Sequence, residues 1–232
     1  MSNSSSSVAA AIETAKGQDT LHTITAVRHL SPRAYVVQME RNDLTFAPGQ
    51  YVYAGLPTDK ERREYSVYSP PDSEFLELLI KEFPGGHVSS RLKTMQPGDR
   101  IAVDRANGTF TIDAADVEDK RFYFVGTSTG ISPFHCFSQS YPGLDYRILH
   151  GIKFAEDRFE HEDYPRDRYT PCVSQEEFDG FTGRVTDYLK ENPPDPDCLF
   201  YLCGNVDMIY EVIGMLKGWG IERKRIATEV YF

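Results

Sequence analysis

Short runs with the alternation of β-strands fill the first half of the chain. Apolar and polar positions alternate in 35–40 and in Leu76-Glu77-Leu78, and Pro and Gly separate one run from the next. The pattern predicts six strands, at 21–27, 35–40, 50–56, 65–68, 75–81 and 100–104. Strands at this spacing are typical of a small antiparallel barrel. One helix interrupts them, and we expect it to begin near Ser89 and to carry Leu92 and Met95.

The rhythm changes after the acidic stretch 113–119. Residues 122–125 form a continuous apolar run, as expected of a parallel strand that is buried on both faces. Similar runs follow at 146–150, 171–174, 199–203 and 226–231, with helical segments between them. In the helix predicted at 206–217, Asn205 is the expected N-cap and Gly218 the expected stop. The second half therefore predicts a five-stranded parallel, doubly wound α/β sheet.

These patterns divide the chain into three parts. Residues 1–18 are a Ser-rich tail that we expect to be disordered, 19–116 form the barrel domain, and 117–232 form the α/β domain. The barrel domain is thus all β with one helix, and the second domain is α/β.

The composition of the chain argues against several classes of protein. The chain has 232 residues, 40% hydrophobic and 26% charged, and a net charge of -10, which argues against a nucleic-acid partner. No apolar run reaches about eighteen residues, and the N-terminus lacks an export or transit signal, so we expect a cytoplasmic protein without membrane insertion. Four scattered cysteines predict free thiols and no metal site. We expect a monomer.

The segment G-T-S-T-G-I-S-P-F at 126–134 follows a predicted strand and opens a predicted helix. Such a turn presents backbone N–H groups to a pyrophosphate, and the helix dipole adds positive potential. Ser132 suits the N-cap and Pro133 the first turn. If the glycine motif is considered alone, a tight turn that binds no ligand explains it equally well.

A second anion site is suggested by 84–92, P-G-G-H-V-S-S-R-L, where paired glycines and Ser89 precede the helix. Its alternative is a simple N-capped helix. The tetrapeptide Arg63-Glu64-Tyr65-Ser66 adds a guanidinium, an aromatic plane and a hydroxyl. Alone, it would be an ordinary strand with a partly buried tyrosine.

Taken together and in this order, these motifs resemble the ferredoxin:NADP reductase family of flavoproteins from residue 20 to residue 232. The matching segments are 48–51, 63–66, 85–89, 126–134, 183–187, 203–205 with Met208, and the terminal E-V-Y-F at 229–232.

The resemblance implies a role in FAD binding for each matching residue of the barrel. Arg63 would bind the pyrophosphate, and Tyr65 would stack on the isoalloxazine. Ser66 would form a hydrogen bond near flavin N5. The pyrophosphate loop would consist of Gly85, Gly86, His87, Val88 and Ser89.

In the second domain the resemblance implies a nicotinamide site. Thr127 and Gly130 would line the nucleotide, with Cys203, Gly204 and Met208 beside the nicotinamide. Ser66, Cys203 and Glu229 would be the catalytic residues. A terminal aromatic, Tyr231 or Phe232, would cover the flavin until the coenzyme displaces it.

Two positions depart from the family pattern. Many NADPH-using members carry Ser-Arg-Glu where this chain has Ser174-Gln175-Glu176, and Lys153 is the nearest compensating cation. We therefore expect relaxed or NADH-leaning coenzyme use. Ser128 replaces a glycine of many relatives, from which we expect an ordinary negative φ there.

The implied function is an FAD-dependent NAD(P)H oxidoreductase that passes electrons to a separate carrier, ferredoxin or flavodoxin. The carrier is separate because the chain has no iron–sulfur cysteine cluster. Acidic net charge predicts a basic face on the carrier, or a local basic patch near Arg91 and Lys93. The alternatives are the reductase component of an oxygenase system, a free-flavin reductase, and a non-catalytic redox-sensing flavin-binding subunit.

Overall fold

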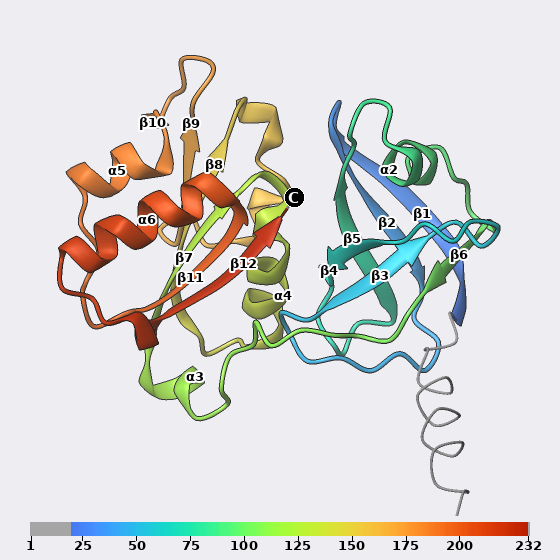
Figure 1. Ribbon diagram of the computed structural model, residues 1–232, viewed down its shortest axis with the longest axis horizontal. Coiled ribbons are helices and arrows are strands. Elements are labelled where there is room, and N and C mark those ends of the chain that lie inside the picture. The colour runs from blue at the N-terminus through green and yellow to red at the C-terminus, as the bar shows by residue number, and fades with distance from the viewer. Residues whose placement is uncertain (1–19, 232) are drawn as a thin grey trace, which may run out of the picture.

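The computed structural model describes residues 20–231, so the predicted Ser-rich tail and Phe232 lie outside the described residues. The described chain forms two units that lie side by side, each built on its own sheet (Figure 1). Within these residues, every helix is too short or too polar to cross a membrane.

The first unit is an antiparallel sheet of six strands in the order β4-β3-β6-β1-β2-β5. The strands are β1 Thr20–Ser31, β2 Ala34–Glu40, β3 Tyr51–Gly55, β4 Arg63–Ser66, β5 Phe75–Lys81 and β6 Arg100–Val103. Just after β4, Val67 pairs with Leu78 of β5 in an antiparallel bridge, and the Tyr68 N–H donates to the Glu77 carbonyl at 2.9 Å. These bonds close the sheet, so the predicted six-stranded barrel is confirmed.

The helix of the barrel differs from its prediction at both ends. Helix α2 spans His87–Leu92, because Gly86, in extended conformation, is its N-cap. It therefore begins two residues before Ser89. Met95 lies beyond its last residue and packs against the barrel core from the following turn.

The second unit is a parallel sheet in the order β10-β9-β8-β7-β11-β12. Its strands are β7 Arg121–Thr127, β8 Asp145–Ile152, β9 Tyr169–Val173, β10 Phe181–Thr182, β11 Leu199–Asn205 and β12 Ile226–Tyr231. The five predicted strands are all present, and the crossing order on the two sides of β7 makes the sheet doubly wound. The sixth, β10, has only two residues at the edge, too few to give a hydrophobic pattern.

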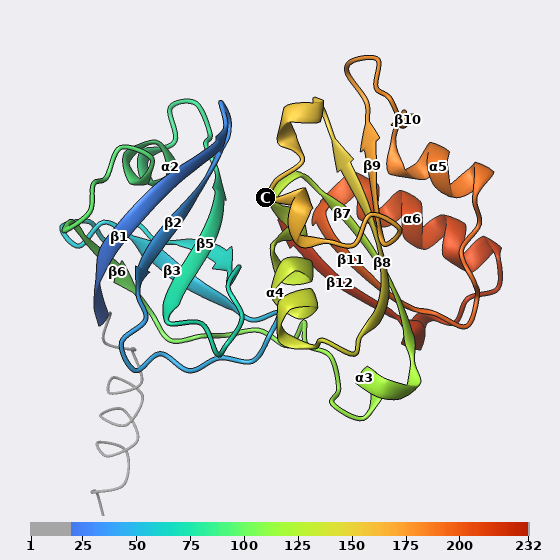
Figure 2. The ribbon, with the colours of Figure 1, turned by 180° about the vertical axis from the view of Figure 1, so that it is seen from behind.

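Helices cover both faces of this sheet (Figures 1 and 2). Helix α4 packs on the face toward the barrel, while α5 and α6 cover the other face. The helices are α3 Asp116–Asp119, α4 Ser132–Ser140, α5 Val185–Glu191 and α6 Val206–Gly218. The 3-10 turns are η1 Ser128–Ile131, η2 Ala155–Asp157, η3 His161–Asp163 and η4 Arg223–Arg225.

The helix ends test the capping predictions. The Asn205 side chain accepts from the N–H groups of Asp207 and Met208, as predicted for the N-cap of α6. Gly218, the predicted stop, is instead the last residue of the helix, and Trp219 is its C-cap. Ser132 does not cap α4, because Ile131 is the N-cap and the Ser132 hydroxyl donates to the Thr129 carbonyl at 2.8 Å.

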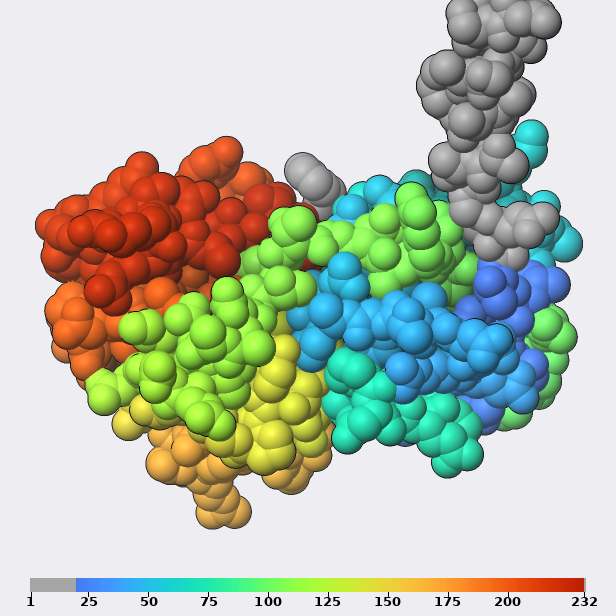
Figure 3. Space-filling model, turned by 90° about the horizontal axis from the view of Figure 1, so that it is seen from below, coloured from blue at the N-terminus to red at the C-terminus, as the bar shows by residue number. Residues whose placement is uncertain are grey.

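The two units share a hydrophobic core, which Figure 3 shows as a continuous contact between the lobes. Val36, Tyr68 and Phe110 of the barrel belong to the same buried cluster as Phe134 and Phe137 of α4. A second cluster fills the barrel, and a third lies under α5 and α6. Because apolar burial and not a flexible linker joins the units, their relative orientation is fixed in this structure.

Polar contacts reinforce the same junction. The Ser31 hydroxyl donates to Asp157 at 2.9 Å, and Arg33 contacts the other oxygen of that carboxylate at 2.8 Å. Arg28 reaches Glu160 at 2.8 Å. These residues hold the segment after β8 against strands β1 and β2 of the barrel.

Candidate functional site

Side chains from both units meet where the end of β4 faces the end of β12. The Ser66 hydroxyl donates to Glu229 Oε1 at 2.6 Å and accepts from the Tyr231 hydroxyl at 2.6 Å. Cys203 Sγ lies 3.9 Å from the same Glu229 oxygen, because Cys203 and Glu229 are paired in the parallel register of β11 and β12. The three predicted catalytic residues are therefore brought together, with Tyr231 beside them.

Burial changes the acid–base properties of this group. Burial raises the pKa of Glu229 from its ordinary value of 4.5 to about 7, against the hydrogen bond from Ser66, which lowers it. Burial also raises the pKa of Cys203 and of Tyr231 well above their ordinary values. At neutral pH, Glu229 is thus the member of this group that exchanges a proton.

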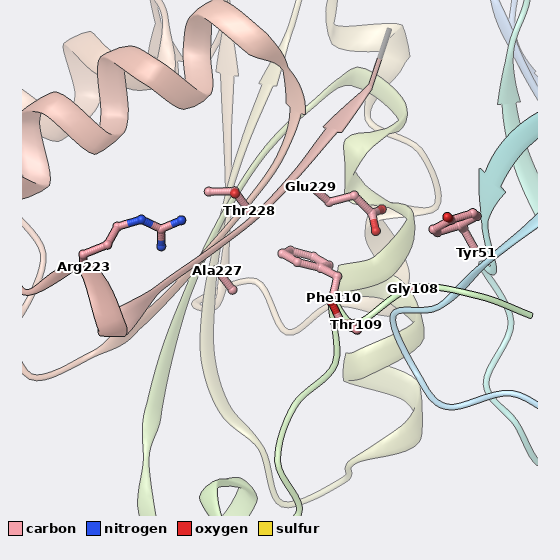
Figure 4. A pocket seen from close by; sticks show the side chains of 8 residues that line it. All are labelled: Tyr51, Gly108, Thr109, Phe110, Arg223, Ala227, Thr228 and Glu229. Atoms are coloured by element: carbon pink, nitrogen blue, oxygen red, sulfur yellow. The ribbon is translucent and has the colours of Figure 1, made fainter.

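A cavity of about 460 Å³ opens beside Glu229 at the junction of the two units. Its lining residues are Tyr51, Gly108, Thr109, Phe110, Arg223, Ala227, Thr228 and Glu229. Glu229 points from β12 toward Tyr51 of the barrel, while Arg223 lies at the far end (Figure 4). Solvent in this cavity reaches the carboxyl group, which gives its proton an exit.

The second predicted site lies at the carboxyl ends of β7 and β11. A Cβ on Gly130 would meet the Cys203 carbonyl oxygen at 2.5 Å, and a Cβ on Gly204 would meet Thr127 Oγ1 at 2.4 Å. The Asn205 N–H donates to Thr127 Oγ1 at 2.9 Å. Thr127, Gly130 and Gly204, which we expect to line the nucleotide, are thus packed close together.

Met208 belongs to this segment in a different way. Its side chain is buried in the apolar cluster under α6, and its N–H donates to the Asn205 cap at 3.2 Å. Its contacts are therefore those of a core residue at the start of the helix.

The expected backbone conformation of Ser128 is wrong. Its φ is +53°, in the left-handed region that favours glycine. His150 Nε2 lies 2.8 Å from the Ser128 carbonyl oxygen, and burial lowers the pKa of His150 to about 4, so a neutral ring donates this bond at pH 7. Ser128 therefore adopts a conformation that usually favours glycine, although it carries a side chain.

The predicted pyrophosphate residues cluster at the other end of the barrel. Gly85 has a φ of +78° and open space around the position of a Cβ. Ser89 Oγ accepts from the Phe83 N–H at 3.1 Å, which closes the loop before α2, and Val88 is buried. The Arg63 guanidinium contacts Glu61, and His87 Nε2 contacts Asp59.

The residues predicted to select the coenzyme lie after β8 and β9. The Gln175 N–H donates to the Lys153 carbonyl at 2.9 Å, and the Ser174 hydroxyl donates to the Ile152 carbonyl at 3.1 Å. Glu176 accepts from the Ala155 N–H at 2.5 Å. The Lys153 side chain is exposed. Backbone and side-chain bonds thus join the segment after β9 to the segment that carries Lys153.

One residue at this edge was missed by sequence reasoning. Partial burial lowers the pKa of Lys81, at the end of β5, and the positive charge of nearby Lys153 lowers it further. The alternating pattern of β5 does not indicate that Lys81 lies near a residue of the other unit. Lys93, which we expected in a basic patch, is instead paired with Glu82.

Flavin and dinucleotide fit these residues. The Arg63 side chain is 58% exposed and offers N–H donors, and Tyr65 presents a ring that packs against the barrel core at one side. Glycines at 126, 130 and 204 leave room only for backbone where a side chain would clash. The barrel residues Arg63 and Tyr65 and the glycines of the second unit both lie near the junction that holds Ser66 and Glu229.

Comparisons with known proteins agree with this geometry. Residues 21–112 match the family model of the oxidoreductase FAD-binding domain. The chain is 29% identical to a ferredoxin–NADP reductase of Pseudomonas aeruginosa, over 86% of this chain and 89% of that protein. It is 28% identical to a flavodoxin/ferredoxin–NADP reductase of Rhodobacter capsulatus, over 86% of each. In fold it is similar to a ferredoxin NADP+ reductase from Neisseria gonorrhoeae, with a TM-score of 0.82 and 22% identity over 94% of this chain and all (100%) of that one.

A β-barrel joined to a doubly wound sheet, with a polar group buried at their junction, defines an FAD-dependent oxidoreductase with a dinucleotide-binding domain. The barrel matches the oxidoreductase FAD-binding domain, and the chain is similar over most of its length to ferredoxin–NADP reductases.

Proposed function

We propose that this chain transfers electrons between NAD(P)H and a separate one-electron carrier, ferredoxin or flavodoxin. The observation that carries the proposal is the hydrogen-bonded Ser66–Glu229–Tyr231 group at the junction of the two units. The names of the relatives from Pseudomonas aeruginosa and Rhodobacter capsulatus support the kind of carrier.

In this proposal the barrel holds FAD. Arg63 donates to the pyrophosphate, Tyr65 stacks on the isoalloxazine, and Ser66 faces N5. Gly85, Gly86, His87, Val88 and Ser89 form the pyrophosphate loop. Bound FAD supplies the exchange between two-electron hydride chemistry and single-electron transfer.

The residues of the chain position the rings and handle one proton. The barrel core holds Tyr65, and the core shared by the two units holds their relative position, so these residues would orient the flavin and the coenzyme toward each other. Glu229, with a pKa of about 7, holds or releases a proton toward Ser66 Oγ at 2.6 Å. Cys203 stays a neutral thiol, because burial raises its pKa.

Thr127, Gly130, Gly204 and the backbone at Met208 would line the nicotinamide coenzyme. Lys153, Ser174 and Gln175 would meet the adenosine end, and Lys81 adds a cation there. Because Glu176 lies two residues from Ser174 and caps the Ala155 N–H, a 2'-phosphate would meet a carboxylate as well as Lys153.

We therefore predict NADH-leaning or relaxed coenzyme use. A steady-state comparison of kcat/KM for NADH and NADPH measures it, and a preference for NADPH above roughly a hundredfold, about 2.7 kcal/mol, would contradict it. Glu176→Gln should shift the ratio toward NADPH, because it removes a negative charge. Glu191→Gln, at the distant end of α5, is the charge-matched control.

The proposal as a whole is tested by dye reduction. The purified chain with FAD should reduce ferricyanide in the presence of NADH or NADPH, whereas a non-catalytic flavin-binding subunit would show no coenzyme-dependent reduction. Reduction of added free flavin by a chain that retains no FAD would instead favour a free-flavin reductase.

The cellular context is part of the same proposal. We propose that the chain acts as a monomer in the cytoplasm. Size-exclusion chromatography with light scattering tests the monomer.

A further inference from the structure

The loop of residues 57–62 joins β3 to β4 and carries two acids, Asp59 and Glu61. Its fold is held by its own polar groups. Arg62 Nη1 donates to the carbonyl oxygens of Leu56 at 2.9 Å and Glu61 at 3.2 Å. The Glu61 N–H donates to Asp59 Oδ1 at 3.0 Å. The loop also packs on β3, where a Cβ on Gly55 would meet the Glu61 carbonyl oxygen at 2.4 Å.

Both carboxylates of this loop contact a positively charged or N–H-donating side chain from the pyrophosphate site. Glu61 Oε1 contacts Arg63 Nη2, and Asp59 Oδ2 contacts His87 Nε2. One ligand atom from each of Asp59, Glu61 and His87 lies within 4.8 Å of the others. The two acids therefore converge on the donors that the proposed function assigns to the FAD pyrophosphate.

A carboxylate and a phosphate are competing acceptors for these donors. The N–H groups of Arg63 and His87 that are bonded to Glu61 and Asp59 are not at the same time available to phosphate oxygens. A carboxylate that stayed in place would also repel the two negative charges of the pyrophosphate. A bound pyrophosphate would therefore compete with Glu61 for Arg63 Nη2 and with Asp59 for His87 Nε2.

We propose that Asp59 and Glu61 form an acidic gate over the pyrophosphate site and set the affinity of the chain for FAD. This inference rests on the proposed function, because it uses the assignment of Arg63 and His87 to FAD. The two acids compete with the pyrophosphate for the N–H donors of Arg63 and His87, so each acid weakens the binding of FAD.

The gate is tested by FAD binding to the full-length chain after removal of flavin, measured as quenching of FAD fluorescence on titration with protein. Asp59→Asn and Glu61→Gln should each lower the Kd for FAD about fivefold, since each exposed ion pair contributes on the order of that factor. The gain should shrink as salt is raised, because salt screens exposed charges.

Glu74→Gln is the matched control, because Glu74 is also exposed and lies outside this cluster. Its Kd should equal that of the unmodified chain. Far-UV circular dichroism and the thermal midpoint should be unchanged in all three variants, which separates a change of affinity from a change of fold.

A Kd that is unchanged in both loop variants would overturn the gate. A raised Kd in Asp59→Asn would also overturn it, and would show that Asp59 orients His87 toward the phosphate. If the unmodified chain and every variant fail to bind FAD, the proposed function fails with it; if all bind FAD equally, the gate alone fails.

Discussion

Glu229 gives the site its pH dependence at the scale of a single residue. It is buried among Ser66, Cys203 and Tyr231, and its pKa rises to about 7. An acid whose pKa is higher in the folded chain stabilises the fold while it is protonated. That stability is lost as pH rises from the ordinary value of 4.5 through about 7.

Replacement of Glu229 by glutamine should remove this loss. Near pH 5 the free energy of unfolding of Glu229→Gln should be close to that of the unmodified chain. At pH 8 it should be higher by about 3 kcal/mol, at 1.36 kcal/mol for each unit of the shift. Urea unfolding at several pH values measures it. A difference that does not change with pH would contradict the role of burial, and Glu74→Gln should show no such trend.

Ser128 shows how one residue can keep the conformation of another type. Its φ is +53°. This conformation is strained for any residue that has a Cβ atom, but not for glycine. The bond from His150 to its carbonyl holds this conformation in place.

Ser128→Gly should therefore stabilise the chain by about 0.5 kcal/mol, since relief of the left-handed strain exceeds the greater chain entropy of glycine in the unfolded state. Chemical denaturation at pH 7 measures it. Ser138→Gly, inside helix α4, is the control and should destabilise by about 0.5 kcal/mol. Equal losses in the two variants would refute the strain.

At the scale of elements, the dinucleotide turn depends on a close approach of two backbones. Turn η1 packs against the end of β11 because Gly130 has no Cβ to meet the Cys203 carbonyl. The same contact brings Thr127 to Gly204, so that packing and coenzyme binding depend on one geometry.

Gly130→Ala should destabilise the chain by about 2 kcal/mol or more, because the obstacle is backbone and cannot rotate away. It should also raise KM for the coenzyme. Gly214→Ala is the control: it lies in helix α6 with no atom within 4 Å of the new Cβ, and should stabilise by up to about 1 kcal/mol. A neutral result for Gly130→Ala in thermal unfolding would argue against the close approach.

The elements themselves could largely be predicted from the sequence. Residues 122–125 are apolar without alternation, which indicates a strand that is buried on both faces, and Phe124 in β7 is indeed fully buried. Asn205 has the side chain that an N-cap requires, and it caps α6. These features depend on local chemistry, which a short window of sequence contains.

What could not be predicted depends on tertiary contacts. The left-handed φ of Ser128 contradicts its residue type, because the turn is imposed by neighbours on β8 and β11. The pairing of Asp59 with His87 joins residues that are 28 positions apart. The proximity of Lys81 to Lys153 crosses from one unit to the other.

At the scale of the whole molecule, the reacting group exists only because the two units meet. Ser66 comes from β4 of the barrel, while Glu229 and Tyr231 come from the last strand of the parallel sheet. The shared core around Tyr68, Phe110 and Phe134 keeps these strands in register. A change that separates the units should therefore abolish electron transfer even if each sheet remains folded.

The central claim is that this junction allows a nicotinamide coenzyme to reduce FAD held by the barrel. Anaerobic stopped-flow mixing of the FAD-loaded chain with NADH, and separately with NADPH, tests it most directly through the visible absorbance of the flavin. We predict loss of the oxidised flavin absorbance at a rate at least as high as kcat, and a rate at least about tenfold lower in Ser66→Ala. A chain that binds FAD but leaves it oxidised with both coenzymes would contradict the account.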